Sequence, residues 1–319
     1  MNNSTNGSNV SSPCVVDEQY KYIYLPVAYS ICAFCGIILN GFVLWKLTLR
    51  TKKWNSTSIF MINLAVADFL YALSLMFLVH SYVNEDVWIF GDFMCRIVRF
   101  LFYFNLYGSI LFLGCMSLYR YLGICHPLST RSWHRRRVTF AICMTVWLCL
   151  LAETAPYLYF AGTLEHAGGQ ADCFDFVPDL TNQHLPYGIV IVLTGFLIPF
   201  VAILVFYARI IHTLRMSMRA AGSNVQAGSA INRRKAVYTI VVVLTIFVIC
   251  HLPYSTTKLV YVVYDRMYGD CQAAIVSKSY KITRPFCSLN CVLNPLLYFV
   301  PRSRPRVDRP ITHVETMPD

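Results

Sequence analysis

Charged residues are scarce in this chain of 319 residues. Asp, Glu, Lys and Arg together make up 13% of the chain, about half the share of a typical soluble globular protein. Hydrophobic residues make up 56%, and the mean hydropathy is +0.51. This composition excludes a disordered chain, a fibrous chain and most soluble enzymes. It indicates a polytopic membrane protein, in which lipid rather than water covers most of the surface.

Metal-ligand and catalytic spacings are also missing. The chain has 13 cysteines, but the C-x-x-C of Cys32 and Cys35 lies inside an apolar run, which disfavours a zinc or redox site. No nucleophile–base or metal constellation marks an accessible cleft, so we predict that the chain is not an enzyme and has no cofactor. Lys281 lies near the outer end of the last apolar segment rather than at its middle, which disfavours a retinal-binding pump.

Long apolar segments dominate what is present. Each is long enough to cross a membrane, which takes about 20 helical residues, and a helix is the only open-chain structure that satisfies its own backbone in lipid. The seven segments are 22–47, 57–81, 93–124, 138–160, 186–213, 232–263 and 274–300. We therefore predict an all-α membrane protein, a seven-transmembrane helix bundle over residues 22–300, with an outer tail over 1–21 and an inner tail over 301–319.

Basic residues predict the orientation of the bundle. With the N-terminus outside, 16 Lys and Arg residues fall in inner loops and the C-terminal tail, against 3 in outer segments. This asymmetry follows the positive-inside rule. The net charge of +11 is thus an orientation signal, and we expect membrane lipid but no nucleic acid among the partners.

The N-terminal tail carries four overlapping or adjacent Asn-x-Ser/Thr sequons, at Asn2, Asn3, Asn6 and Asn9. Such a cluster at one end of the chain predicts an extracellular glycosylated segment. A chance occurrence in a stretch rich in Ser and Asn is the alternative.

Short motifs occur in order, one or more per segment. They are G-I-I-L-N-G at Asn40, N-L-A-V-A-D at Asp68, Y-R-Y around Arg120, C-H-L-P ending at Pro253, and N-P-L-L-Y at 294–298. With this set the chain resembles the rhodopsin-like (class A) G-protein-coupled receptors. The stretches at 88–113, S-T-T-K at 255–258 and Y-K-I-T-R-P at 280–285 resemble the purinergic nucleotide receptors of the Y type.

The resemblance implies a multi-pass receptor of the plasma membrane. Its ligand would be an extracellular nucleotide of the ADP, ATP, UDP or UTP class, and it would signal through heterotrimeric G proteins to phospholipase C and calcium. Three alternatives stay open: a receptor for another small anion such as a dicarboxylate or lipid acid, a silent or decoy receptor, and a seven-helix transporter or channel.

Four basic residues near the outer ends of helices are candidates for a phosphate site, since charges within a membrane are costly. Guanidinium groups bind phosphate bidentately, Lys acts as a mobile point charge, and aromatic rings can stack on a base. In the resembling family the corresponding positions contact the phosphates. The expected ligand-binding set is Arg99, Phe102, Tyr103, Tyr254, Ser255, Lys258, Tyr280, Lys281 and Arg284. The alternative is snorkelling, in which each basic side chain reaches the interface and binds nothing.

Two residues near this set differ from the family pattern. Ser255 stands where the family usually has His, and His251 where it usually has an aromatic residue. His251 could respond to pH or donate to a ligand, although a satisfied buried His is the simpler interpretation. Among outer acids, Asp172 and Asp175 are the best candidates to pair with the basic cluster in the empty receptor. An ordinary solvated loop is the alternative.

The resemblance also implies two disulfides and an ion site. Cys95–Cys173 is the pairing of the whole class and Cys14–Cys271 that of the nucleotide receptors, and all four cysteines face an oxidising compartment. Deeper in the bundle, oxygen ligands suit a hard cation, and in the class this constellation holds an allosteric sodium ion. The polar set is Asp68, Ser109, Asn290 and Asn294. A hydrated or protonated Asp68 without an ion is the alternative.

At the inner end the resemblance implies an activation switch and a G-protein contact. Arg120 would move to meet Tyr207 and Tyr298, and Tyr119 replaces the acid that usually precedes this arginine, so an ionic restraint is expected to be absent. The switch set is Arg120, Tyr207, His251, Pro253, Asn294, Pro295 and Tyr298. The expected G-protein contacts are Arg120, Leu128, Arg135, Arg136 and Arg137.

Overall fold

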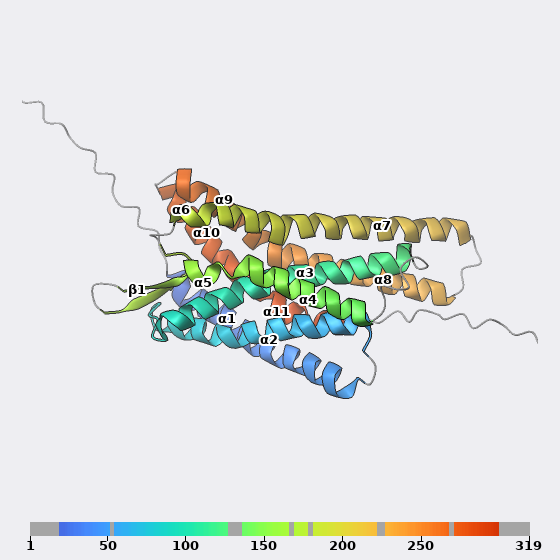
Figure 1. Cartoon of the computed structure of the whole chain (residues 1–319), viewed down its shortest axis with the longest axis horizontal. Coiled ribbons are helices and arrows are strands. Elements are labelled where there is room, and N and C mark those ends of the chain that lie inside the picture. The colour runs from blue at the N-terminus through green and yellow to red at the C-terminus, as the bar shows by residue number, and fades with distance from the viewer. Residues whose placement is uncertain are drawn as a thin grey trace, which may run out of the picture.

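The computed structural model describes residues 19–51, 54–126, 136–165, 169–177, 181–221, 227–267 and 271–299. Long helices lie roughly side by side along one axis, and a small hairpin, in which β1 pairs antiparallel with β2, caps one end (Figure 1). The predicted glycosylation sites Asn2, Asn3, Asn6 and Asn9 and the inner tail 301–319 fall outside the described residues, as does Cys14. The expected Cys14–Cys271 disulfide therefore stays a prediction.

The helical elements follow the apolar segments and are interrupted at prolines and π-helical turns. In chain order they are α1 (Tyr20–Trp45), η1 (Lys46–Arg50), α2 (Ser56–Val83), α3 (Gly91–Cys125), α4 (Arg136–Thr154), α5 (Tyr157–Phe160), α6 (Thr181–Val192), η3 (Leu193–Leu197), α7 (Ile198–Ala221), α8 (Ala227–Ile246), η4 (Phe247–His251), α9 (Leu252–Met267), α10 (Cys271–Ser288), α11 (Asn290–Leu293) and α12 (Leu296–Phe299). The strands are β1 (Gly162–Glu165) and β2 (Ala171–Phe174).

Local signals explain several boundaries. The Asn55 side chain caps α2 by accepting a hydrogen bond from the Ser58 backbone N–H at 2.8 Å, which satisfies one of the free donors of the first turn. Pro156 separates α4 from α5, and Pro295 separates α11 from α12. Proline lacks the N–H that continues a helix, so the two prolines in the sequence explain both breaks.

Six of the described helical stretches are long and apolar enough to span a membrane. They are Tyr20–Arg50, Ser56–Val83, Gly91–Cys125, Arg136–Phe160, Pro186–Met216 and Val237–Val263. The seventh predicted segment is helical, but it is divided into α10, α11 and α12 and is not among the six. Basic and amide side chains inside this segment lower its hydropathy, and the prediction of seven helices is confirmed by its helical structure together with the six apolar spans.

The helices pack consecutively around an aromatic core. α1 packs against α2, α2 against α3, α3 against α7, and α9 against α10. Many of the largest fully buried side chains are tyrosines, among them Tyr71, Tyr103, Tyr157 and Tyr254. A buried tyrosine needs a partner for its hydroxyl, so hydrogen bonds run through this core, for example between Tyr71 and Ser288 at 2.6 Å.

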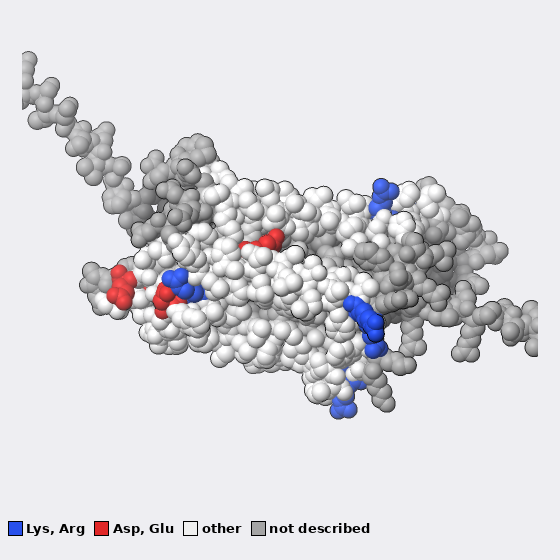
Figure 2. Space-filling view, viewed as in Figure 1, with Lys and Arg blue, Asp and Glu red and all other residues white. Residues whose placement is uncertain are grey.

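Charge is distributed along the axis in the way that the sequence predicts. Figure 2 shows most of the basic side chains of this face at the end opposite the hairpin, acidic side chains and one basic group near the hairpin end, and a broad band between them that carries one acidic patch and is otherwise uncharged. This band matches the exposed apolar side chains of the long helices. Basic residues at one end of the bundle are consistent with an inner, cytoplasmic end there.

Candidate functional site

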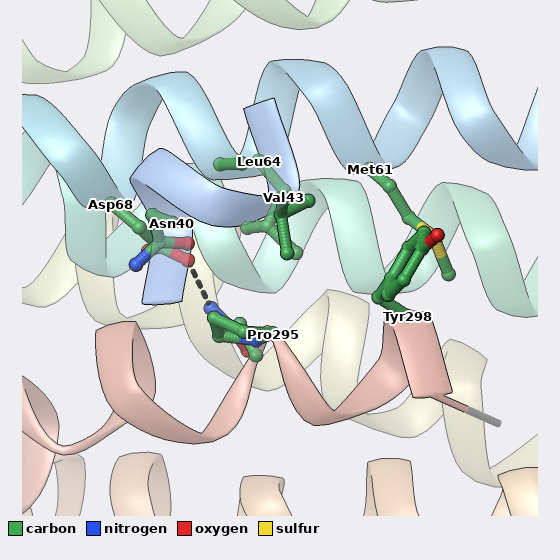
Figure 3. Close-up of a pocket in the computed structure, with 9 residues that line it drawn as sticks. Asn40, Val43, Met61, Leu64, Asp68, Pro295 and Tyr298 are labelled. Carbon is green, nitrogen blue, oxygen red and sulfur yellow. Dashed lines mark hydrogen bonds between the residues drawn. The ribbon is translucent and has the colours of Figure 1, made fainter. Parts of the chain in front are cut away.

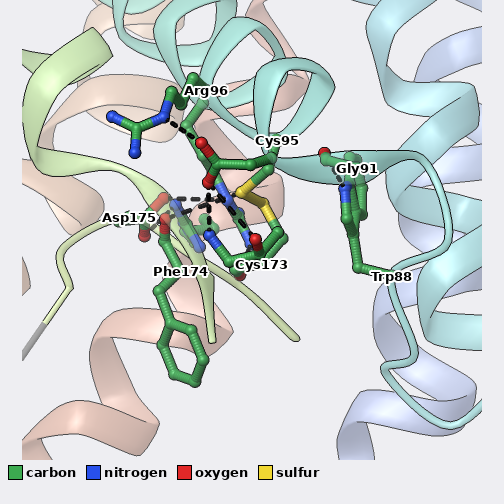
Figure 4. Close-up of a disulfide and its surroundings, with 11 residues drawn as sticks. Trp88, Gly91, Cys95, Arg96, Cys173, Phe174 and Asp175 are labelled. Atoms are coloured by element: carbon green, nitrogen blue, oxygen red, sulfur yellow. Dashed lines mark hydrogen bonds and ion pairs between the residues drawn. A yellow bond between two sulfur atoms is a disulfide. The ribbon is translucent and has the colours of Figure 1, made fainter. Parts of the chain in front are cut away.

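A disulfide attaches the hairpin to the third helix at the outer end of the bundle (Figure 4). Cys95, in the second turn of α3, bonds to Cys173 of β2 with a Cα–Cα distance of 5.6 Å, so this predicted pairing is confirmed. The Trp88 backbone N–H donates to the Ala171 carbonyl at 2.7 Å, and its indole donates to the Gly91 carbonyl at 2.8 Å. The hairpin is therefore held from two sides.

A second attachment, which the sequence analysis missed, fixes the other strand. Arg96 donates from Nε to Asp92 at 2.6 Å and from Nη1 to the Leu158 carbonyl at 2.8 Å. Asp92 in turn accepts the Thr163 backbone N–H at 2.9 Å. Because Arg96 and Asp92 are four residues apart, they share a helix face; that spacing was the available signal.

Asp175, just after β2, lies between two arginines from different helices. Its Oδ1 is 3.3 Å from Arg99 Nε, and its Oδ2 contacts Arg284 Nη2. Arg99 also donates to the Cys173 carbonyl at 2.7 Å. Burial works against ionisation of Asp175, but the charges of Arg284 and then Arg99 outweigh it and hold its pKa below the ordinary value. The expected pairing of an outer acid with the basic cluster is thus confirmed for Asp175.

Aromatic rings form the floor beneath the two arginines. The Arg284 guanidinium lies 5.0 Å from the Phe102 ring centre and 5.5 Å from that of Tyr280. The Tyr280 hydroxyl is 3.0 Å from that of Tyr103 and 3.2 Å from that of Tyr254. One hydroxyl cluster therefore links the third, sixth and seventh helices directly below the arginine pair.

Lys258 does not join the arginines. Its ammonium donates to the Tyr157 hydroxyl at 2.6 Å and to the Tyr107 hydroxyl at 3.3 Å, and the residue is 1% exposed. The sequence predicted one phosphate site with Lys258, Arg99 and Arg284, whereas in the structure Lys258 bonds to tyrosines and the two arginines pair with Asp175. Tyr107 and Tyr157 were missed, although Tyr107 is one helical turn from Tyr103.

The rest of the expected ligand-binding set lies near these two places. Ser255 is buried one helical turn before Lys258, and Lys281 is half-buried one turn before Arg284. Among the buried charged side chains that the structure describes in the outer half, Asp175 is the acid that pairs with Arg99 and Arg284, and Lys258 is a third cation that bonds to tyrosine hydroxyls instead. Three cations against one carboxylate leave an excess of positive charge, which favours an anionic ligand.

The deeper polar set forms around Asp68, which lines a small pocket with Asn40, Pro295 and Tyr298 (Figure 3). Asp68 accepts from Asn105 at 2.7 Å, from Asn294 at 3.0 Å and from Ser109 at 3.5 Å. Asn105, one turn before Ser109, had not been predicted. The pocket has a cavity volume of about 10 Å³, about enough for one water molecule.

Two asparagines near Asp68 keep unused bonding capacity. Within the described ranges, Asn294 Oδ1 and both side-chain polar atoms of Asn290 are buried and form no hydrogen bond. Carboxylate, hydroxyl and amide oxygens are the ligands of hard cations, so the donor set fits an ion such as sodium. The described residues hold no group of three or more His, Cys, Asp and Glu side chains that could bind a metal ion.

His251 occupies a buried position in η4, just before Pro253. It packs 5.0 Å from the Phe247 ring. Neither ring nitrogen has a hydrogen-bond partner among the residues that the structure describes. The expected partners of a satisfied buried histidine are thus not supplied by any described protein group.

At the inner end, Tyr207 lies inside the bundle and bonds to Ser117 at 2.7 Å. Arg120 has no carboxylate partner in the described part of the chain, and the preceding Tyr119 packs edge-on against Phe60 at 6.1 Å. Two further residues of the expected switch, Pro295 and Tyr298, line the pocket below Asp68. Of the expected G-protein contacts, Arg136 and Arg137 are exposed at the start of α4. Leu128 and Arg135 fall outside the described residues.

The chain is similar to known proteins over nearly its whole length. Residues 39–298 match the 7 transmembrane receptor (rhodopsin family). The chain is 39% identical over 310 residues to the Y-type purinoceptor 3 of Gallus gallus, covering 94% of this chain and 90% of the relative. It is 41% identical over 295 residues to the Y-type purinoceptor 6 of Rattus norvegicus, covering 90% and 87%, and 38% identical over 306 residues to the Y-type purinoceptor 2 of Homo sapiens, covering 95% and 80%.

Proposed function

The chain belongs to the rhodopsin family of seven-transmembrane receptors, and we propose that within it the chain is a receptor for an extracellular nucleoside di- or triphosphate that signals through heterotrimeric G proteins. As a member of this family it is a multi-pass protein of the plasma membrane and not an enzyme. The relatives at 37–41% identity carry the name purinoceptor, which supports a nucleotide ligand.

The shared carboxylate of Asp175 carries the proposal. Two buried arginines, one from α3 and one from α10, converge on this single acid of the hairpin. A phosphate chain offers two or more anionic groups to the same guanidiniums, and bidentate bonds to phosphate are among the strongest polar contacts. Phosphate binding would therefore displace Asp175 and move the hairpin relative to the seventh helix.

The aromatic floor supplies the second half of a nucleotide site. Phe102, Tyr254 and Tyr280 present ring faces and hydroxyls directly below the arginines. A nucleobase can stack on such rings, and hydroxyls can read its polar edge. Ligand binding would act by differential affinity for two arrangements of the bundle.

We also propose that a sodium ion binds beside Asp68 and favours the resting state. Asp68 and Ser109, with the side-chain oxygens of Asn290 and Asn294 that have no partner among the described residues, would hold it. The ion would supply positive charge that keeps the carboxylate ionised inside the bundle. At the inner end, Arg120, Leu128, Arg135 and the exposed Arg136 and Arg137 would contact the G protein.

Calcium and cyclic AMP responses in transfected cells test the proposed function. The panel is ADP, ATP, UDP, UTP, a dicarboxylate and a lipid acid, applied to wild type, Arg284→Gln and the control Lys278→Gln on the same helix. A nucleotide response that Arg284→Gln removes and Lys278→Gln keeps, at equal surface expression, is the expected result. A response to the acids alone would favour the other-anion receptor, and silence toward every ligand would favour a decoy.

A further inference from the structure

Lys258 is a buried cation that forms no ion pair with a carboxylate in the described part of the chain. The residue is 1% exposed, and no carboxylate of the described residues lies within ion-pair distance of its ammonium. Burying an uncompensated charge is expensive, and a charge within a membrane segment indicates function unless a partner explains it. The hydrogen-bond partners of Lys258 are neutral hydroxyls, so its burial as a cation needs another source of stabilisation.

Three tyrosines replace the missing carboxylate. The Lys258 ammonium lies 4.2 Å from the ring centre of Tyr103, 5.1 Å from that of Tyr157 and 5.8 Å from that of Tyr107. The Tyr157 and Tyr107 hydroxyls accept its hydrogen bonds. Ring faces attract cations through their quadrupole. We call these three residues the tyrosine box.

A partition separates the tyrosine box from the arginine pair. Tyr103 presents its ring to Lys258 and bonds through its hydroxyl to Tyr280, which lies under Arg284. An anion seated on Arg99 and Arg284 thus displaces Asp175 first. The same anion contacts Lys258 only if it has a further anionic group that extends past Tyr103 to the ammonium.

We propose that the tyrosine box competes with the ligand for the ammonium of Lys258, and that Tyr157 sets how many anionic groups a ligand must offer. The inference rests on the proposed function only in that the ligand is an anion with several charged groups. Both bonds have the ammonium as a charged donor, but a phosphate oxygen also carries negative charge and so adds a Coulomb attraction that a neutral hydroxyl lacks. The longest phosphate chain gains Lys258 from the tyrosine box, whereas a monophosphate is bound by the arginines alone.

Removing one hydroxyl tests this competition. Tyr157→Phe keeps the ring but deletes the 2.6 Å bond to Lys258. Because a hydrogen bond to a charged group is lost from the competing state, we expect the affinity for inorganic tripolyphosphate to rise about tenfold and that for inorganic phosphate to stay unchanged. Tyr107→Phe, which deletes the longer 3.3 Å bond, should act in the same direction more weakly.

Thermal shifts of the purified receptor with phosphate, pyrophosphate and tripolyphosphate give the affinities without any nucleoside or G protein. Lys258→Gln should abolish the gain from Tyr157→Phe in the double variant, and Tyr159→Phe, which changes an exposed tyrosine of the same short helix, should match wild type. The melting temperature without ligand reports folding.

Three results would overturn the inference: a loss of tripolyphosphate affinity in Tyr157→Phe, a gain that persists without Lys258, or no polyphosphate binding by any variant. The test is separate from that of the proposed function. A receptor that answers no nucleotide in cells but shows the Lys258-dependent gain would refute the nucleotide assignment and keep the tyrosine box.

Discussion

Replacing Asp175 by Asn removes the carboxylate that Arg99 and Arg284 share, and the substitution should have two opposite effects. The three side chains are 7–10% exposed, so solvent screens their interaction little. Removing one partner of a buried ion pair costs about 3–5 kcal/mol. Asparagine keeps a polar oxygen in place, so we expect a loss of stability near the lower end of that range.

Ligand binding should change in the other direction. In wild type an anion must displace Asp175 before it gains the two guanidiniums, and in Asp175→Asn this competition is gone. If the binding free energy becomes about 1.4–2.8 kcal/mol more favourable because Asp175 no longer competes, the affinity rises 10- to 100-fold. The purified variant should therefore melt roughly 5–10 °C lower than wild type without ligand, yet bind the activating nucleotide more tightly.

The assay is a melting curve with and without nucleotide, with competition binding on the same preparation. Glu165→Gln, which changes an exposed carboxylate of the same hairpin, is the control and should leave both quantities unchanged. A parallel loss of stability and affinity in Asp175→Asn would refute the reasoning, because it would mean that Asp175 supports the ligand rather than competing with it.

The same contacts lead to three further predictions. In wild type, agonist potency should fall about fivefold when sodium chloride replaces choline chloride in the buffer. Asp68→Asn should remove this dependence on sodium, and a variant that keeps it would exclude the site. Arg96→Gln should lower agonist potency about fivefold at unchanged surface expression, since it frees the β1 side of the hairpin; equal potency would show that the disulfide alone positions Asp175. The low pKa of Asp175, set by Arg284 and Arg99 against burial, means that its stabilising effect is complete above the unfolded value of about 3.9 and is lost only as pH falls through the folded value. The difference in melting temperature between wild type and Asp175→Asn should thus stay constant from about pH 8 to 5.5, and a decline within that window would contradict the assigned direction.

Hydropathy and motif order were sufficient to predict the bundle, because lipid allows few alternatives to a helix. The seventh helix was predicted over 274–300 as well, but its division into α10, α11 and α12 was not. Arg284, Asn290 and Asn294 must face the interior, and they lower the mean hydropathy of the segment that holds them. In that helix, polar residues that face the bundle interior lower the mean hydropathy of a segment that still spans the membrane. A hydropathy average does not distinguish such a helix from one that is too polar to span.

The candidate site could be predicted in its residues but not in its grouping. The spacing placed Arg99, Arg284 and Lys258 near the outer ends of their helices, which is where they lie. Which cation meets which partner depends on helix rotation and on side chains from outside the long helices, such as Asp175 and Tyr157. Periodicity within one helix carries no information on these contacts between helices.

The two ring nitrogens of His251 show a second limit of sequence reasoning. The residue was expected to be an ordinary satisfied histidine, and its position below the aromatic floor leaves it without a hydrogen bond among the described residues. Unsatisfied buried groups are rare and call for an explanation. The position of His251 in the sequence did not predict that no described protein group would bond to these nitrogens.

Equilibrium binding of the activating nucleotide to the purified receptor tests the central claim most directly, with wild type compared with Arg284→Lys and Arg284→Gln. Lysine keeps the charge but loses the bidentate fork, so affinity should fall about tenfold for Lys and about 100-fold or more for Gln. Wild-type affinity in Arg284→Gln, in a protein that melts normally, would contradict phosphate binding by the arginine pair.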